Sequence, residues 1–144
     1  MLKTFHQHRS ELERLVEMFR HDKGLGRVGR NFTRPADPGR VGVSAARIAE
    51  YRRLCDAIGA PNCIEGYDSA FDSTFPEEKN PILIHVSAKG FALPGSGSGK
   101  GFVYSMNPDA GFIVVGDLDA VVPNGEGDWL RRIEGPWYLH FDTN

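Results

Sequence analysis

The sequence lacks the features that mark several large classes of protein. It has two cysteines in 144 residues, which is too few for a small scaffold built on many disulfides. It has no apolar run long enough to cross a membrane, and a hydrophobic fraction of 40% excludes a disordered tail. The first residues, MLKTFHQHRSELERL, contain no apolar signal-peptide core. This predicts a cytoplasmic protein, although a chain whose leader had been removed would look the same.

The chain as a whole has little excess charge of either sign, but the two signs are unevenly distributed along it. The formal net charge is −2, and such a near-neutral chain does not predict general binding of nucleic acid, which needs a clustered basic face. Residues 1–60 carry a surplus of five positive charges, whereas residues 61–144 carry a surplus of seven negative charges. Either the two halves attract each other within the fold, or they present opposite charges to a partner.

Motifs for cofactors and catalysis are absent or fail on context. Gly24 to Gly29 satisfies GxGxxG, but a helix precedes it and a proline-rich loop follows, which is the wrong setting for a dinucleotide. The segment GSGSGKG resembles a phosphate-binding loop, but Pro94 replaces its first glycine and Gly101 its magnesium-binding hydroxyl. The sequence therefore predicts neither a cofactor nor a metal. An anion site built from the backbone and Lys100 stays open.

Hydrophobic periodicity predicts helices first and strands after them. The spacing predicts a helix over Thr4–His21, and a second that begins at the N-cap Ser44 and ends before Gly59. Alternation predicts strands at 63–67, 82–87, 101–106, 111–115, 129–133 and 137–141. We expect a turn or flexible loop over 93–101, a turn at 107–110 that joins the strands on either side of it, and one helical turn over 117–122. We expect residues 1–144 to form a single α+β domain, with two N-terminal helices packed on one face of a mostly antiparallel sheet.

Two segments allow more than one interpretation. Residues 22–43 form a long loop that should either pack through Leu25, Val28 and Phe32 or be functional. Cys55 falls on the apolar face of the second helix, which favours a buried thiol. A disulfide between Cys55 and Cys63 is an alternative, but nothing in the sequence gives it positive support.

Candidate functional residues fall into two groups. His85 and His140 each lie in a predicted strand, on the face opposite its most apolar residues, and would be close if those strands paired. With nearby carboxylates they could carry acid–base catalysis. The second group is an acidic cluster after the helices, which is the predicted contact surface for a basic partner: Glu65, Asp68, Asp72, Glu77 and Glu78.

The segment Ile133–Leu139, IEGPWYL, resembles the ending of a group of small bacterial proteins with no assigned activity. The stretch VSAARIAEYR at 43–52, the Ser- and Gly-rich segment 95–101 with Phe102 after it, and DLD at 117–119 are also similar to that group. Residues 69–80 depart from its pattern. The resemblance runs from about Leu12 to Asp142 and implies a shared fold and a bacterial origin.

These observations favour a non-enzymatic domain that binds another protein, such as a bacterial inhibitor or a toxin-neutralising immunity protein. An acidic cluster would steer a basic partner toward it. Two alternatives remain. One is a small enzyme that uses His85 or His140, and the other is an anion-binding module at Lys100.

Overall fold

The computed structural model describes residues 1–66, 81–90, 97–108, 112–119 and 127–143. Its helices are α1 (Leu2–Gln7), α2 (Arg9–His21), the 3-10 helix η1 (Pro38–Val41) and α3 (Ala45–Ala57). Its strands are β1 (Arg27–Val28), β2 (Thr33–Arg34), β3 (Ile64–Gly66), β4 (Ile82–Gly90), β5 (Gly97–Tyr104), β6 (Ile113–Val114), β7 (Gly127–Glu134) and β8 (Trp137–Thr143).

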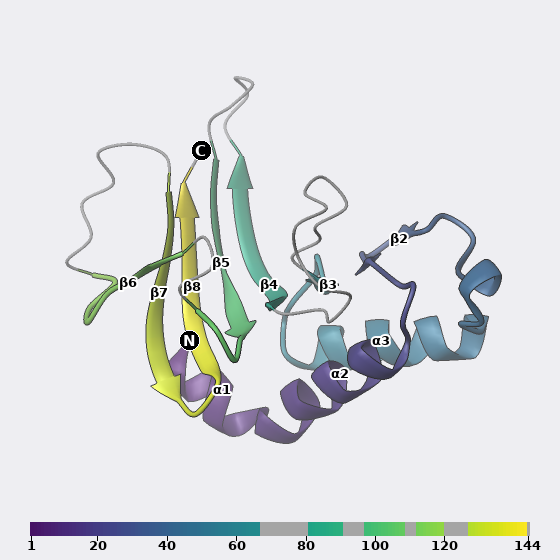
Figure 1. The fold of residues 1–144 in the computed structure, drawn as a ribbon, viewed down its shortest axis with the longest axis horizontal. Coiled ribbons are helices and arrows are strands. Elements are labelled where there is room, and N and C mark those ends of the chain that lie inside the picture. Colours follow the sequence, from purple (N-terminus) through teal and green to yellow (C-terminus); the bar gives the residue numbers. More distant parts are fainter. Residues whose placement is uncertain (67–80, 91–96, 109–111, 120–126, 144) are drawn as a thin grey trace.

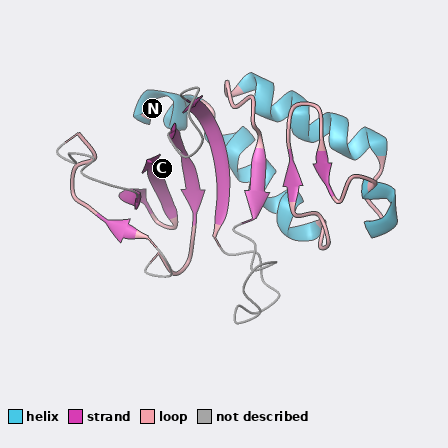
Figure 2. Ribbon diagram, turned by 90° about the horizontal axis from the view of Figure 1, so that it is seen from above, coloured by secondary structure: helices cyan, strands magenta, loops and turns pink. Residues whose placement is uncertain are grey.

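The strands of this part of the chain form one sheet of eight, in the order β2-β1-β3-β4-β5-β8-β7-β6 (Figures 1 and 2). Neighbouring strands are antiparallel except β6 and β7, which are parallel. The prediction of a mixed α and β fold with a mostly antiparallel sheet is therefore confirmed. Among the described residues, no helix combines the length and apolar character needed to cross a bilayer.

The predicted helix over Thr4–His21 is divided at His8, whose φ of −117° and ψ of 29° interrupt the helical backbone. The interruption lets α1 take its own direction, and Phe5 then packs against Phe102 and Trp137, with ring centroids 5.9 and 5.6 Å away. A six-residue helix is too short to be stable in isolation. Burial of Phe5, which is 0% exposed, therefore anchors α1.

The second predicted helix is confirmed as α3. The Ser44 hydroxyl accepts a hydrogen bond from the backbone N–H of Arg47, and Gly59 follows the helix with a φ of 70°, where a Cβ would be unfavourable. Helices α2 and α3 lie side by side (Figure 1). Between them, the carboxylate of Asp22 accepts hydrogen bonds from Arg47 Nε and from the Tyr51 hydroxyl, each at 2.8 Å.

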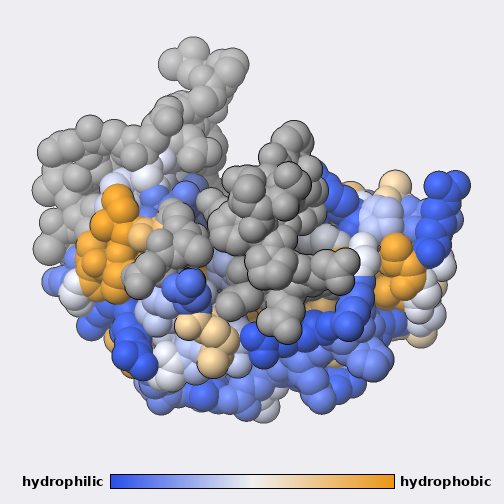
Figure 3. All heavy atoms as spheres, in the orientation of Figure 1, coloured by the Kyte–Doolittle hydropathy of each residue, from blue (hydrophilic) through white to orange (hydrophobic). Residues whose placement is uncertain are grey.

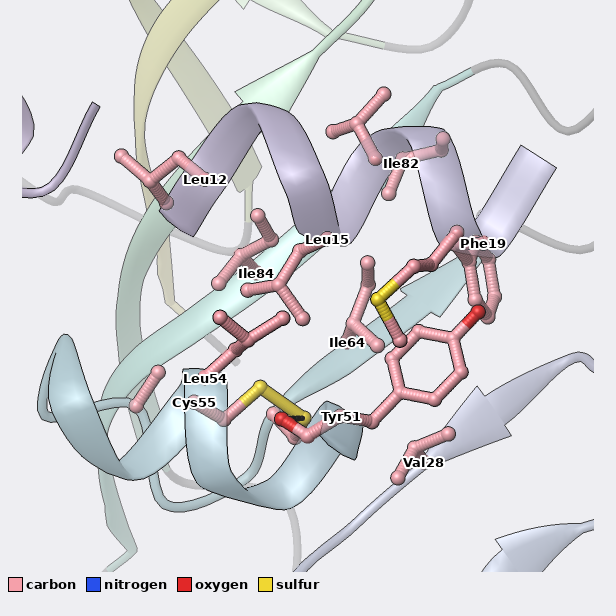
Figure 4. Packing of buried hydrophobic residues seen from close by; sticks show 14 of the residues in the cluster. Leu12, Leu15, Phe19, Val28, Tyr51, Leu54, Cys55, Ile64, Ile82 and Ile84 are labelled. Atoms are coloured by element: carbon pink, nitrogen blue, oxygen red, sulfur yellow. Dashed lines mark hydrogen bonds between the residues drawn. A yellow bond between two sulfur atoms is a disulfide. The ribbon is translucent and has the colours of Figure 1, made fainter. Parts of the chain in front are cut away.

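One buried apolar cluster joins the helices and the sheet (Figure 4). Its members on strands are Val28, Ile64, Ile82, Ile84, Phe102, Trp137 and Leu139, and its largest members on α1–α3 are Phe5, Leu12, Leu15, Met18, Phe19, Tyr51 and Leu54. A smaller cluster comprises Leu83, Val103, Phe112, Leu130 and Tyr138. The strand residues of the two clusters alternate along β4, β5 and β8, so they lie on opposite faces of the sheet.

The expectation of a free thiol at Cys55 is wrong, because Cys55 forms a disulfide with Cys63 (Figure 4). Cys55 is buried as predicted, at 2% exposure. The chain turns back after α3 at Gly59, which brings Cys63 beneath the helix with its Cα 5.2 Å from that of Cys55. That separation suits a disulfide, and the two residues are close only because of this turn.

The long loop at 22–43 contains β1, β2 and η1, and it packs through Leu25 and Val28, which are both 0% exposed. The third expected anchor, Phe32, is 48% exposed. Its ring lies over Gly29, where a Cβ would collide with it, and 5.2 Å beneath the guanidinium of Arg27. Phe32 therefore packs locally on the surface and does not reach the core.

Two expectations for the second half are wrong. The strands on either side of residues 107–110 do not form a hairpin, because β8 pairs with β5 in the place that β6 would have taken, and β6 pairs with β7. Residues 117–119 are not helical either. There the carboxylate of Asp117 accepts a hydrogen bond from the N–H of Asp119 at 3.0 Å, which forms a turn. Residues 120–122, the rest of the predicted helical turn, lie outside the described residues.

Candidate functional site

A groove of about 610 Å³ lies between the start of α1 and the strands β5, β8 and β7. Its cationic lining residues are Lys3, Lys100 and Arg131, and Asp119 contributes a carboxylate. Its remaining lining residues are Met1, Leu2, Leu118, Leu139, His140 and Phe141. The volume is within the range of roughly 300 to 1,000 Å³ that is typical of small-molecule sites.

The register of the sheet explains how the cations reach this groove. Lys100 on β5 is directly opposite Phe141 on β8, and Arg131 on β7 is directly opposite Leu139. Side chains alternate along β8, so Leu139 and Phe141 share one face of the sheet with both cations. A strip of two apolar residues therefore lies between a lysine on one side and an arginine on the other.

Two aromatic rings pack next to Lys100 at the groove. The ammonium of Lys100 lies 5.5 Å from the centroid of the Phe141 ring, a cation–π arrangement. Trp129 stacks on Phe141 from β7, with ring centroids 5.9 Å apart and an interplanar angle of 27°. Because neighbouring strands hold both contacts, Lys100 has a preferred position at the groove.

The charges of the groove are unbalanced. Within the described residues, Lys3, Lys100 and Arg131 take part in no ion pair, whereas some arginines elsewhere do, such as Arg47 with Asp22 at 2.8 Å. Asp119, the acidic residue of the lining, is exposed at the rim. Three cationic groups therefore converge on one groove, to whose lining the described part of the chain contributes one carboxylate.

The segment around Lys100 was expected to be a turn or flexible loop over 93–101, and this is wrong for residues 97–101. They belong to β5, whose backbone pairs with β4 on one side and β8 on the other. The N–H groups of the strand donate hydrogen bonds to the neighbouring strands, so they do not form the backbone anion site that the sequence allowed. Residues 91–96 lie outside the described residues. The side chain of Lys100 is what this segment contributes to the groove.

The two histidines lie on the other face of the sheet from Leu139 and Phe141. Their strands do not pair, because β5 lies between them, and Gly101 is directly opposite both His85 and His140. A Cβ at Gly101 would collide with the carbonyl oxygen of Ile84, at the β-bulge of β4. The glycine thus permits a close approach of β4, and the two histidines lie two strands apart in the same row.

Each histidine has a carboxylate partner. Nε2 of His85 lies 2.6 Å from Oε1 of Glu65, and Nε2 of His140 lies 2.9 Å from Oδ1 of Asp128, so each carboxylate can accept a hydrogen bond from the Nε2–H tautomer of its histidine. His140 is 3% exposed and lies beneath the ring of Phe112, with centroids 5.9 Å apart. Within the described residues its Nδ1 atom is buried without a hydrogen bond, and Oδ1 of Asp142 is 3.9 Å away from it.

Of the predicted acidic cluster, Glu65 is described, and Asp68, Asp72, Glu77 and Glu78 lie outside the described residues. The Glu65 side chain is 23% exposed and pairs with Arg27 at 3.0 Å as well as with His85. Burial raises its pKa, but the hydrogen bond from His85 and the charges of His85, Arg27 and Arg34 outweigh burial, so the pKa lies below the usual range. Glu65 is therefore a charged group whose carboxylate is engaged by Arg27 and His85 within the fold.

Sequence reasoning selected Lys100 but not its partners in the groove. Lys3 lies on α1, far from Lys100 in sequence, and Arg131 is one of two adjacent arginines on β7. The alternation of Trp137, Leu139 and Phe141 predicted a core strand, and Trp137 and Leu139 are buried in the main cluster, whereas Phe141 is half-buried at the groove. Among the described residues, no group of three or more His, Cys, Asp or Glu side chains is arranged to hold a metal ion.

Comparison with known proteins adds no relative: no protein-family model, curated protein or solved structure shows significant similarity to this chain.

Proposed function

We propose that this protein is a non-enzymatic binding domain that takes a small anionic ligand in the groove at Lys100. The observation that supports the proposal most directly is the convergence of Lys3, Lys100 and Arg131 without ion-pair partners among the described residues. Unpaired cations in a concave site attract carboxylate or phosphate groups, and charge-assisted hydrogen bonds then hold them.

The fold supplies a rigid base for such a site. Lys100 and Arg131 come from strands on either side of β8, and both strands pair with it along most of its length. We also infer that the helices pack on the same sheet face, since α1–α3 and the inward residues of β3, β4, β5 and β8 share one buried cluster. The groove then lies at the edge of the helical layer, next to the first residues of α1, beyond which none of the described helices covers the sheet.

Titration calorimetry with inorganic phosphate tests the proposal. We expect saturable binding, and we expect Lys100→Gln and Arg131→Gln each to weaken it about tenfold, because each removes a charged contact of roughly 1.4 kcal/mol. Lys23→Gln is the matched control, since Lys23 is exposed, lies outside the groove and changes the net charge equally. Equal losses in all three variants would mean that general charge attracts the ion, and the proposal would then be wrong.

A protein partner with a basic surface, met by the acidic segment at 68–78, is a second proposal. What favours it is the negative surplus of residues 61–144. Part of that surplus is used internally, since Glu65 pairs with Arg27 and Glu134 pairs with Arg9. Neutralising Asp68, Asp72, Glu77 and Glu78 together should slow association with such a partner and reduce its salt dependence. A bacterial toxin that this protein neutralises would be a partner of that kind.

A further inference from the structure

We infer that the ligand of the groove is amphipathic: a carboxylate or phosphate group attached to an apolar body that lies against the exposed side chains of Met1 and Leu2 and the half-buried side chain of Phe141. This inference rests on the proposed function, because it assumes that the cations at the groove receive an anion. It adds the chemical class of the rest of the ligand.

The lining itself is the first argument. Beside the three cations, the groove is lined by the apolar side chains of Met1, Leu2, Leu118, Leu139 and Phe141. Met1 and Leu2 are 37% and 38% exposed, and they are among the few large apolar side chains of the described residues that are left open to solvent. Leu118 and Phe141 are half-buried. An inorganic anion alone would leave these surfaces in water, whereas an apolar body would cover them.

The arrangement of charge around the strip is the second argument. Lys100 and Arg131 are two strands apart and offset by two residues, which places their Cα atoms about 12 Å from each other. Between them on this face of the sheet lie two apolar residues: Leu139, which is 6% exposed and belongs to the core, and Phe141, which is half-buried. A ligand whose charged end meets one of the cations therefore extends its remaining atoms over apolar side chains.

Other exposed apolar residues do not belong to this site. Figure 3 shows an apolar patch over β6, where Ile113 and Val114 are 54% and 46% exposed. These two residues lie on the edge strand and do not line the groove. They provide a control surface of similar chemistry without cations.

A homologous series of straight-chain carboxylates tests the inference by calorimetry with the full chain. Each methylene that is fully buried strengthens binding about fourfold, and each that is half buried about twofold. We therefore expect octanoate, which has four methylenes more than butanoate, to bind at least about tenfold more tightly. We also expect 1-octanol, which lacks the charge, to bind far more weakly than octanoate.

Two variants separate the parts of the ligand. Leu2→Gln should weaken octanoate at least threefold and leave butanoate unchanged, whereas Lys100→Gln should weaken both. Ile113→Gln is the control and should change neither. If octanoate and butanoate bind equally and both depend on Lys100, the inference is wrong and the anion site stands. If 1-octanol binds as well as octanoate, both the inference and the proposed function are wrong.

Discussion

Replacing Glu65 by glutamine should destabilise the fold, because its carboxylate serves two partners in a site that is mostly closed to water. It accepts a hydrogen bond from His85 at 2.6 Å and pairs with Arg27 at 3.0 Å. Hydrogen bonds to charged groups contribute roughly 1.5 to 3 kcal/mol, so Glu65→Gln should lower the free energy of unfolding at neutral pH by about that amount. An acid whose main role is to meet a partner would show no such loss.

The direction in which the pKa of Glu65 is shifted determines how its contribution to stability depends on pH. The pKa of Glu65 is lower in the folded protein than its usual value, because the hydrogen bond from His85 and the nearby charges outweigh burial. Its contribution is therefore fully present above the pKa of an unfolded glutamate, about 4.3, and it is lost as the pH falls through the folded pKa. The stabilities of wild type and Glu65→Gln should therefore converge as the pH falls below the folded pKa of Glu65.

Urea unfolding measured from pH 7 into the acid range tests this reasoning. Glu17→Gln is the matched control, since Glu17 pairs with Arg14 on the surface with a side chain that is 72% exposed, and no measurable change is expected. A Glu65→Gln protein as stable as wild type at pH 7, or a difference that persists unchanged in acid, would refute the assignment of Glu65 to the fold.

Three further predictions concern stability. Replacing Cys55 and Cys63 together by alanine should lower the free energy of unfolding by about 2.5 kcal/mol, the chain-entropy value for a disulfide that joins residues eight positions apart, and a reductant should lower wild type by a similar amount in urea unfolding. Gly101→Ala should cost about 1–3 kcal/mol in thermal unfolding, because the added Cβ meets the backbone of Ile84; an unchanged midpoint would mean that β4 does not approach β5 so closely. Phe5→Ala should cost about 3 kcal/mol or more in urea and increase hydrogen exchange in α1, since this ring anchors the helix; unchanged exchange there would contradict that role.

The local structure of the chain was predictable where one short-range signal dominates. The helix at Ala45–Ala57 combines a serine N-cap, apolar residues at helical spacing and a glycine after its end, and the structure contains all three. The alternation at 82–87 and 137–141 likewise identified β4 and β8. These signals depend on neighbours within a few residues, which a sequence presents directly.

Pairing between distant segments was not predictable in the same way. Nothing near Trp137–Thr143 indicates that β8 pairs with β5, and this pairing is what separates His85 from His140 by one strand. The disulfide depends on the turn after α3, because cysteines eight positions apart match no characteristic motif. The groove is the least local feature, since its cations come from α1, β5 and β7.

The candidate site was therefore predicted only in part. The sequence singled out Lys100 as part of an anion site built from loop backbone. The backbone around Lys100 is instead a strand paired on both sides, so only its side chain contributes to the groove. Arg131 gave no signal, because a basic residue on an alternating strand is typical of a solvent-facing position. Its place opposite Leu139 became apparent from the register of β7 and β8.

The most direct test of the central claim is a titration of the ¹⁵N-labelled protein with octanoate, followed by amide chemical shifts. We predict that the shifts concentrate at residues that line the groove on three elements, around Lys3, Lys100 and Arg131, and that they are lost in Lys100→Gln. Shifts that concentrate instead around Glu65 and His85, or that spread evenly over the exposed lysines and arginines, would contradict it.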